Sequence, residues 1–254
     1  MTEALKIEGL TKRFSGKNGE NFDAVKNVSL TIEAGKCLGL IGESGSGKST
    51  IAKIAGGMLS PTSGSVYLYG QKLPFKGAAA IKARAGTQMI FQNPYSSFSP
   101  RMTMLKALSE SLIYRQPALT SRQRLEKITA ALEEVGLEPE RCLGKRRGEM
   151  SGGECQRAAI ARALLGNPRL LICDEVTSAL DVSIQAQVAG LLAELRKKKN
   201  LTLLFISHDI ALVSCIADSV AIIKAGEIVE SGETGAVLRQ PRHPYTKKLI
   251  DFCR

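Results

Sequence analysis

A glycine-rich segment over residues 42–49 has the residue types and spacing needed to bind phosphate groups. Its residues are Gly42, Glu43, Ser44, Gly45, Ser46, Gly47, Lys48 and Ser49. They match the pattern G-x-x-x-x-G-K-[ST], in which glycines let successive backbone N–H groups face one anion. A helix that begins near Lys48 would add the positive end of its dipole. The pattern predicts that Lys48 reaches the β- and γ-phosphates of a nucleotide and that the Ser49 hydroxyl ligates Mg²⁺.

Two carboxylates follow an apolar run and form the second part of the predicted site. Residues 170–173 indicate a buried strand that ends at Asp174 and Glu175. In a doubly wound sheet the carboxyl ends of the strands line the ligand crevice. We therefore expect Asp174 to hold Mg²⁺, directly or through water, and Glu175 to polarise or deprotonate the attacking water. The alternative is that this pair only caps the next helix.

A serine followed by two glycines opens a predicted helix at Ser151, Gly152 and Gly153. Exposed backbone amides at a helix N-terminus bind anions, although the same three residues are also an ordinary helix start. One chain that folds around one nucleotide does not need two such phosphate receptors. We interpret the second receptor as serving the nucleotide of a neighbouring subunit.

The segments that must position these residues alternate between strands and helices. Period-two patterns at residues 5–7, 28–32 and 66–68 predict a small antiparallel layer. Apolar runs at 37–41, 169–173 and 201–207 predict buried strands, and strand–helix alternation implies a mostly parallel sheet covered on both faces. A further strand pair is predicted over 220–224 and 227–230.

The middle of the chain, about residues 92–148, is predicted to be mainly helical. Thr120 or Ser121 is predicted to cap a helix that ends at Gly136. Its apolar residues recur at spacings of three and four, at Leu125, Ile128, Leu132 and Val135. A second helix is expected to start at Ser151 and to stop before Gly166.

In combination, these motifs resemble the nucleotide-binding subunits of ABC transporters over nearly the whole chain. The resemblance rests on the phosphate loop, the acidic strand, the signature segment at Ser151–Glu154, the loop at residues 178–181, Gln92 in Phe91-Gln92-Asn93-Pro94, and His208 after a predicted strand. It implies an α/β fold with a RecA-like P-loop NTPase core, an antiparallel β subdomain and an inserted helical subdomain. The whole chain, 1–254, would be one nucleotide-binding domain, with 1–91 and 159–254 as the core and 92–158 as the helical subdomain.

The resemblance also implies a role for individual residues. Gln92 would contact the metal or the water and couple the site to a permease, and His208 would contact the γ-phosphate. Asp181 would lie across a dimer interface, and Phe14 would stack on adenine; the alternatives are helix capping for His208 and core packing for Phe14. The expected nucleotide-binding residues are Phe14, residues 42–49 as named above, Thr50, Ser151, Gly152, Gly153, Glu154 and Asp181. The expected metal-binding residues are Ser49, Gln92 and Asp174, and the expected catalytic residues are Lys48, Gln92, Glu175 and His208.

Three residues depart from the usual family pattern. The signature segment has Met150 and Glu154 where the family usually has Leu and Gln, and Val176 replaces a proline after the predicted catalytic glutamate. The Glu154 carboxylate would either repel the neighbouring nucleotide or accept a hydrogen bond from a ribose hydroxyl. Glu154 therefore points to an unequal pair of subunits.

Composition narrows the class of protein further. Thirty-five Lys and Arg against 24 Asp and Glu give a net charge of +11, which attracts polyanions such as nucleotides, nucleic acid or an anionic membrane surface. The six cysteines include no C-x-x-C pair, and with two histidines they indicate neither a zinc site nor a disulfide framework. No apolar stretch approaches the length of a membrane span, so another chain is expected to supply any spans.

Residues 91–103 and 242–246 resemble those of importers of oligopeptides, nickel and metallophores. The longer C-terminal extension of many peptide importers is missing, which favours the shorter nickel or opine-metallophore type. This resemblance implies an ATPase that is peripheral at the cytoplasmic face of the inner membrane. Its expected partners are a second, homologous but non-identical ABC subunit, two permease subunits and, indirectly, an extracytoplasmic solute-binding protein, with no nucleic acid.

Two other classes of protein are alternatives. A soluble ABC ATPase that acts on nucleic acid or ribosomes would use the +11 charge to bind phosphates. Such proteins usually carry paired cassettes or long coiled coils, which this sequence does not show. A P-loop kinase is the third class, and it would leave the Ser151 motif without a role.

Overall fold

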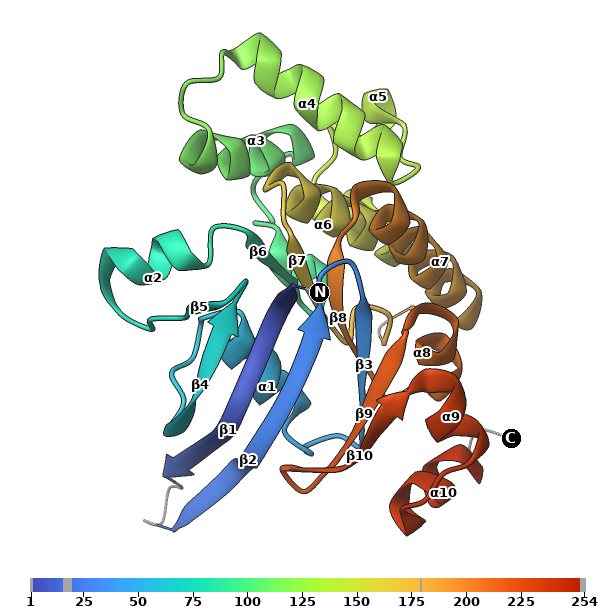
Figure 1. Ribbon diagram of the computed structural model, residues 1–254. Coiled ribbons are helices and arrows are strands. Elements are labelled where there is room, and N and C mark those ends of the chain that lie inside the picture. Colours follow the sequence, from blue (N-terminus) through green and yellow to red (C-terminus); the bar gives the residue numbers. More distant parts are fainter. Residues whose placement is uncertain (1, 16–19, 179, 252–254) are drawn as a thin grey trace.

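The computed structural model describes residues 2–15, 20–178 and 180–251, whose ribbon is shown in Figure 1. The larger of its two sheets has six strands. In spatial order they are β10 (Glu227–Glu233), β9 (Ser219–Lys224), β3 (Cys37–Ile41), β8 (Thr202–Ser207), β7 (Leu170–Asp174) and β6 (Thr87–Ile90). Neighbouring strands from β9 to β6 are parallel, and β10 is antiparallel to β9. The predicted parallel sheet and the predicted β9–β10 pair are confirmed.

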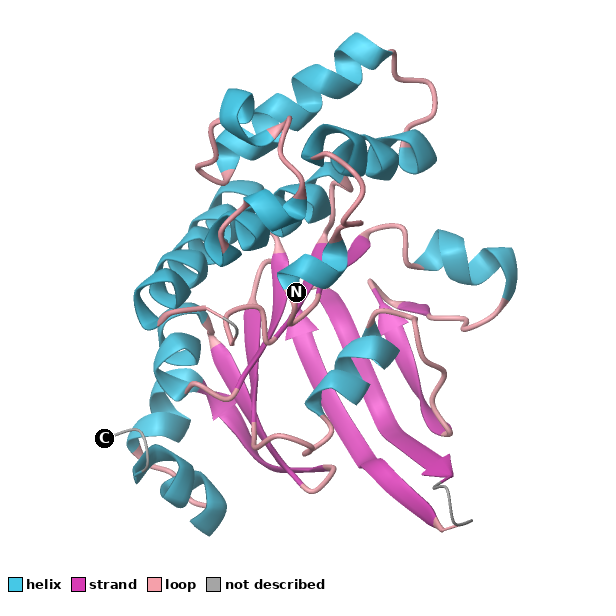
Figure 2. Ribbon diagram, turned by 180° about the vertical axis from the view of Figure 1, so that it is seen from behind, coloured by secondary structure: helices cyan, strands magenta, loops and turns pink. Residues whose placement is uncertain are grey.

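The smaller sheet is antiparallel, as the period-two patterns predict. Its strands, in order, are β2 (Asn21–Glu33), β1 (Glu3–Ser15), β4 (Ser63–Leu68) and β5 (Gln71–Lys72). Helix α1 (Lys48–Ala55) contacts β1 and β2 of this sheet and also β7 and β8 of the larger sheet. Figure 2 shows α1 from behind, with both sheets in view. The helix that follows the phosphate loop is therefore held by both sheets.

Alternate residues of the buried strands face two separate cores. In β7, Leu171 and Cys173 pack into a core with the helices that follow β6 and β7. Leu170 and Ile172 of the same strand pack into a second core with α1 and the antiparallel sheet. A strand buried on both faces needs apolar residues at every position, which explains the continuous apolar run from Leu170 to Cys173.

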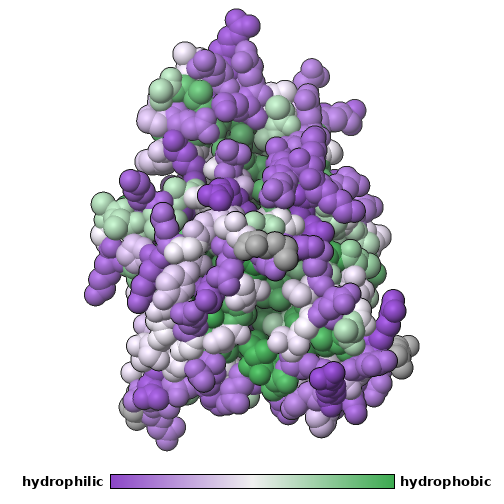
Figure 3. All heavy atoms as spheres, in the orientation of Figure 1, coloured by the Kyte–Doolittle hydropathy of each residue, from purple (hydrophilic) through white to green (hydrophobic). Residues whose placement is uncertain are grey.

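Most of the remaining helices lie on one side of the larger sheet or above it (Figure 1). Between β4 and β7 along the chain are α2 (Gly77–Ala83), α3 (Met104–Arg115), α4 (Ser121–Glu134), α5 (Pro139–Cys142) and α6 (Gly152–Leu165), with 3₁₀ helices at Pro94–Ser97 and Arg147–Glu149. After β7 come α7 (Val182–Lys199), α8 (Ile210–Ile216), α9 (Thr234–Arg239) and α10 (Pro244–Asp251). Figure 3 shows that hydrophilic residues cover most of the upper helices on this face.

Helix α4 begins where the capping pattern predicts. The Thr120 hydroxyl accepts the Gln123 N–H, and the Gln123 side chain accepts the Thr120 N–H, so a capping box closes the first turn. Ile128, Leu132 and Val135 are buried, whereas Leu125 is 42% exposed. The apolar face of α4 is therefore buried from Ile128 onward but not at Leu125.

The cysteines of the described residues are all free thiols. Cys37, Cys142, Cys155 and Cys173 are buried and Cys215 is exposed, while Cys253 lies outside the described residues. Among the helices that the structure describes, none has the length and apolar character to cross a membrane.

Candidate nucleotide site

The predicted site residues come together because four parallel strands end at the same edge of the sheet. Ile41 pairs with Ser207, so the glycine-rich loop and His208 leave β3 and β8 at the same level. Asp174 pairs with Ile206, and Ile90 pairs with Cys173 on the next strand. The segments that carry Asp174, Glu175 and Gln92 therefore emerge beside the loop. This edge is where open α/β sheets bind ligands.

The loop over residues 42–49 has a backbone that requires glycine. Gly47 has φ of 107°, and a Cβ atom there would lie 2.4 Å from the carbonyl oxygen of Ala24. A Cβ at Gly42 would lie 2.3 Å from the carbonyl oxygen of Ile223. The Gly226 N–H, in the β9–β10 turn, also donates to the Ser46 carbonyl at 3.0 Å. Strands β2 and β9 and this turn therefore hold the curl of the loop.

Lys48 lies under the loop with its side chain 3% exposed. Its Nζ donates to the carbonyl oxygens of Gly42 and Glu43, both at 2.8 Å, and lies 3.6 Å from Glu175 Oε1. Burial lowers the pKa of Lys48, and the nearby Glu175 carboxylate opposes this effect. The ammonium group is thus partly desolvated and held in place, which strengthens its attraction for an anion.

Ser49 and Asp174 place two oxygen atoms side by side. The Ser49 hydroxyl donates to Asp174 Oδ1 at 2.9 Å, and Asp174 is 5% exposed. Burial raises the pKa of Asp174, so its charged form gains from a nearby cation. Mg²⁺ is bound by one or two protein oxygens together with water and phosphate oxygens, and this pair fits that requirement. Within the described ranges no group of three or more His, Cys, Asp and Glu could hold a metal alone.

Glu175 occupies a left-handed backbone conformation with φ of 49°, which is uncommon for a residue other than glycine. Its N–H donates to the Ile206 carbonyl at 3.0 Å, and its Oε2 accepts a hydrogen bond from Gln92 Nε2 at 2.9 Å. Such strained conformations persist where surrounding structure holds them, often at functional sites. Asp181, rather than Asp174 or Glu175, occupies the N-cap position of the next helix, α7, which argues against the capping alternative.

The signature serine closes a capping box at the start of α6. Ser151 Oγ accepts the Glu154 N–H at 3.2 Å, and Glu154 Oε2 accepts the Ser151 N–H at 2.8 Å. Glu154 Oε1 lies 3.4 Å from Lys145 Nζ. The Ser151 N–H is the main cause that lowers the pKa of Glu154, so the carboxylate is stabilised as an anion. The expectation of freely exposed amides is therefore wrong for Ser151 and Glu154, because each N–H already has an acceptor within the chain.

The two signature glycines lie against the loop that follows Glu175 and against the first turn of α7. A Cβ at Gly152 would lie 3.2 Å from Leu180 Cδ2, and one at Gly153 would lie 3.1 Å from Ile184 Cγ2. Glycine at both positions allows this close approach. Asp181 is exposed in the same loop, and the predicted loop residue Ala179 lies outside the described residues.

Phe14 and His208 take neither of their alternative roles. Phe14 is partly exposed rather than in the core, and it stacks on Phe22 with ring centroids 5.7 Å apart. Phe22, which no motif indicates, lies directly opposite Phe14 because β1 and β2 pair as a hairpin. His208 is exposed after β8, and α8 is capped by Asp209, whose Oδ1 accepts the Leu212 N–H at 3.1 Å.

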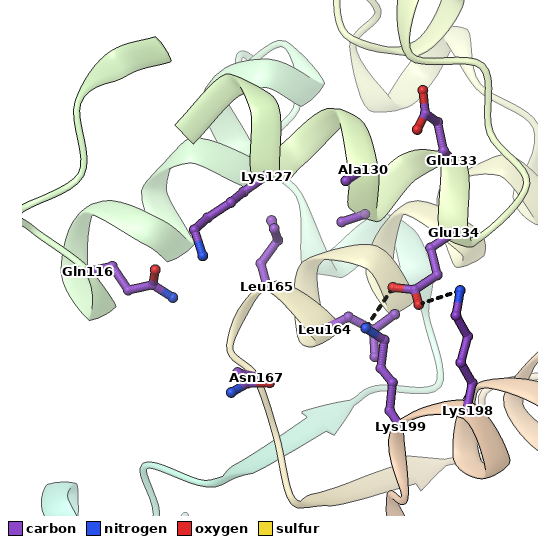
Figure 4. Close-up of a pocket in the computed structure, with 11 residues that line it drawn as sticks. Gln116, Lys127, Ala130, Glu133, Glu134, Leu164, Leu165, Asn167, Lys198 and Lys199 are labelled. Atoms are coloured by element: carbon purple, nitrogen blue, oxygen red, sulfur yellow. Dashed lines mark ion pairs between the residues drawn. The ribbon is translucent and has the colours of Figure 1, made fainter. Parts of the chain in front are cut away.

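A cavity of about 760 Å³ lies away from this site, between α4 and the C-terminal ends of α6 and α7 (Figure 4). Glu134, 14% exposed, points toward Lys198 and Lys199 at distances of 3.4 and 3.0 Å. None of the predicted nucleotide-binding residues lines the cavity. These ion pairs link α4 to α7 and are unrelated to phosphate binding.

A phosphate loop beside a strand that ends in two carboxylates defines a P-loop nucleotide hydrolase. Residues 25–178 match the protein family described as "ABC transporter", and the chain belongs to that family. The predicted resemblance and the predicted fold class are thus confirmed, and this chain is an ABC ATPase that binds and hydrolyses ATP.

Curated relatives and solved structures agree with this assignment. The chain is 43% identical, over 232 residues, to the oligopeptide transport ATP-binding protein OppF of Haemophilus influenzae (strain ATCC 51907), covering 91% of this chain and 70% of OppF. A dimeric ATP-binding cassette in a post-hydrolysis state with ADP and Pi matches with a TM-score of 0.82 and 31% identity, over 91% of this chain and 98% of that one. The cbiO1 subunit of the cbiONQ transporter from Clostridium perfringens matches with a TM-score of 0.83 and 25% identity, over 99% and 100%.

Proposed function

We propose that this chain energises the uptake of peptides through a membrane permease by hydrolysing ATP. The observation that carries the proposal is the network at the sheet edge, in which Lys48, Glu175 and Gln92 are linked beside the phosphate loop. The oligopeptide transport relative supports peptides as the cargo. Nickel and metal-chelator complexes are the alternative cargoes, because residues 91–103 and 242–246 resemble those importers as well.

Within one subunit, each residue of the site has a proposed task. Lys48, Thr50 and the backbone N–H groups of residues 43–49 bind the phosphates, except those of Glu43 and Ser46, which donate within the chain. Phe14 stacks on adenine. Ser49, Asp174 and Gln92 would hold Mg²⁺, which when bound neutralises polyphosphate charge. Glu175 orients the attacking water and accepts its proton, and Gln92 holds the other carboxylate oxygen in place. His208, exposed at the end of β8, contacts the γ-phosphate.

A second ABC subunit completes the site in this proposal. Ser151, Gly152 and Gly153 of one chain bind the nucleotide held by the other, and Asp181 lies at the shared interface. The dimeric state of the ADP- and Pi-bound relative supports this arrangement. Because the γ-phosphate adds contacts only in the closed dimer, hydrolysis releases the interface and drives the transport cycle. Glu154 supports a heterodimer, since pairing with a subunit that lacks this carboxylate would make the two sites unequal.

The permease contact is proposed at the groove between the core and the helices that follow β6. This groove, about 550 Å³ in volume, is lined by Met58, Phe91, Tyr114 and Arg162, among others. Met58 and Tyr114 are 51% and 85% exposed, and Gln92 follows directly after Phe91.

Residues 92–158 would then move as a helical subdomain against the core of 1–91 and 159–254. In this proposal the chain is peripheral at the cytoplasmic face of the inner membrane, with two permease subunits and indirect contact to a solute-binding protein.

The proposal is tested by purifying the tagged chain with its membrane assembly and measuring phosphate release. We expect two permease subunits to co-purify and a peptide-loaded binding protein to stimulate hydrolysis. Lys48→Ala should abolish the stimulated rate, because it removes the phosphate-binding charge. Stimulation by DNA or ribosomes without any permease would instead support the soluble ABC alternative and contradict the importer assignment.

A further inference from the structure

The C-terminal segment that contains Tyr245 reaches the phosphate loop. Tyr245 is the second residue of α10, at the lower right in Figure 1, and is 6% exposed. Its hydroxyl oxygen accepts the N–H of Glu43 at 3.2 Å, although 202 positions separate the two residues. The sequence pattern at residues 242–246 indicates an importer of oligopeptides, nickel or metallophores but assigns no task to Tyr245. The function proposed above gives this tyrosine no role either.

The contact falls on a peptide unit that Lys48 also holds. The Gly42–Glu43 peptide group offers its N–H to Tyr245, and its carbonyl oxygen accepts a hydrogen bond from Lys48 Nζ at 2.8 Å. One end of the peptide group is thus bound from outside the loop and the other from within. Rotation of this peptide group would break both hydrogen bonds and change the anchor of the Lys48 ammonium.

Tyr245 is itself held by several contacts. The Glu230 carboxylate on β10 accepts the N–H groups of Arg242 and His243, at 2.8 and 3.0 Å. His243 Nδ1 accepts the Tyr245 N–H at 3.1 Å, and Lys224 Nζ lies 4.9 Å from the centre of the tyrosine ring. Because a buried side chain with a fixed backbone loses little entropy on making a contact, its hydroxyl is a rigid support.

We infer that Tyr245 is a positioning residue that presets the phosphate loop for ATP by fixing the Gly42–Glu43 peptide group. The inference rests on the proposed assignment of residues 42–49 as the ATP phosphate loop. With this peptide group fixed, the loop and Lys48 need less reordering when the nucleotide binds, and preorganisation of this kind raises affinity. No hydrogen bond or ion pair among the described residues joins Tyr245 to Gln92 or Glu175, so its loss should act on nucleotide binding rather than on the hydrolytic step.

Tyr245→Phe tests the inference, because it removes the hydroxyl and keeps the ring. Loss of one hydrogen bond predicts that the Kd for ATP and the KM each rise about two- to tenfold, with kcat unchanged. The full-length protein is titrated with ATP and with ADP, and its melting temperature confirms that it is folded. Tyr67→Phe on β4 removes a hydroxyl from the antiparallel sheet and should leave Kd and KM at the wild-type values.

Glu230→Ala gives an independent test, because it releases Arg242 and His243 without touching the loop. It should weaken ATP binding, and combining it with Tyr245→Phe should add no further loss, because both changes act through the same hydroxyl. Unchanged affinity in Tyr245→Phe, a lower kcat at unchanged KM, or additive losses in the double variant would overturn the inference. Lys48→Ala separates the two proposals. If Lys48→Ala keeps its affinity for ATP, the assignment of the phosphate loop fails. If Lys48→Ala loses affinity but Tyr245→Phe does not, only the role of Tyr245 fails.

Discussion

The Glu175 carboxylate lies between a positive charge and an amide donor. Lys48 Nζ is 3.6 Å from one oxygen, and Gln92 donates to the other at 2.9 Å. Its side chain is only 15% exposed, so water reaches it from a restricted direction. These contacts suit a residue that must orient one water and accept its proton, provided that the left-handed backbone at Glu175 is maintained.

Glu175→Gln should keep ATP binding and lose hydrolysis. The amide has nearly the same shape as the carboxylate but accepts a proton poorly, and general-base catalysis contributes about 10²- to 10⁴-fold. We expect phosphate release to fall by at least about 10²-fold. Phosphate release and nucleotide titration on the same preparation measure both effects, and a variant with normal turnover would remove Glu175 from the proposed role.

Some residues of the candidate site can be predicted from the sequence, whereas others depend on how distant segments pack. Lys48, Asp174 and Glu175 were identifiable because each lies in a short continuous pattern whose local backbone determines its direction. The contact between Tyr245 and Glu43 was not identifiable, since it depends on how α10 packs against a loop formed much earlier in the chain. For Glu154, the sequence indicates the charge, whereas the contacts with Ser151 and Lys145 depend on the local fold.

At the level of elements, helices α4 and α6 both begin with a capping box but lie in different surroundings. A capping box closes α4 at Thr120 and another closes α6 at Ser151. The first lies among hydrophilic helices, and the second lies against the loop that follows the proposed catalytic glutamate. Comparison of the two can separate the general effect of a cap from a specific role in nucleotide binding.

Ser151→Ala and Thr120→Ala form this matched pair. Each should lower the free energy of unfolding by about 1 kcal/mol, because one helix N–H loses its side-chain acceptor. Only Ser151→Ala should also lower the ATPase rate of the assembled transporter, since Ser151 is proposed to bind the partner's nucleotide. Denaturant unfolding and phosphate release measure the two effects; equal ATPase losses in both variants would make Ser151 merely structural.

Element type was predictable where a pattern was both long and consistent. The apolar run at 170–173 and the period-two alternation at 28–32 lie in strands, and the cap at Thr120 starts a helix, because hydrogen bonding and burial agree locally. Short elements such as β6 and α2 were not predicted. Strand β6 has four residues and is an edge of the larger sheet, so its pairing with β7 depends on tertiary packing.

For the whole molecule, the buried thiols connect stability to pH. Burial raises the pKa of Cys37 to about 12 and that of Cys155 to about 11. In the unfolded chain a thiol ionises near its ordinary pKa of 9.0. Between the two values the unfolded state binds fewer protons than the folded state, so stability present below pH 9 is lost as the pH rises.

The free energy of unfolding should therefore fall between pH 9 and pH 11 by up to about 1.4 kcal/mol per pH unit for each such thiol. Cys37→Ala removes one of these groups and should make the fall shallower, although it also lowers stability at neutral pH. Urea unfolding at a series of pH values measures the slope. A slope identical to that of the wild type would mean that Cys37 ionises equally in both states.

Catalysis by a pair of subunits predicts that activity depends on protein concentration. If Ser151 of one chain completes the site of the other, the rate per subunit should fall on dilution as the dimer dissociates. Phosphate release over a dilution series, with light scattering to follow association, tests this. Glu175→Gln should keep ATP binding but trap the dimer in ATP, because the interface is no longer released by hydrolysis. A constant wild-type rate per subunit at monomer concentrations would contradict the shared site.

Gly152 and Gly153 pack on Leu180 and Ile184. Only a few residues of one chain therefore separate its own nucleotide site from the site that it would complete in its neighbour. Leu180 follows Glu175 by only five positions. Gly152 and Gly153, which Leu180 and Ile184 contact, would lie at the neighbour's ATP. Tightly packed interiors transmit displacement rather than absorb it. In the proposed dimer, a shift at one Glu175 on phosphate loss would therefore be passed to the opposite nucleotide within the same chain. The two sites would then hydrolyse ATP in a coordinated order rather than independently.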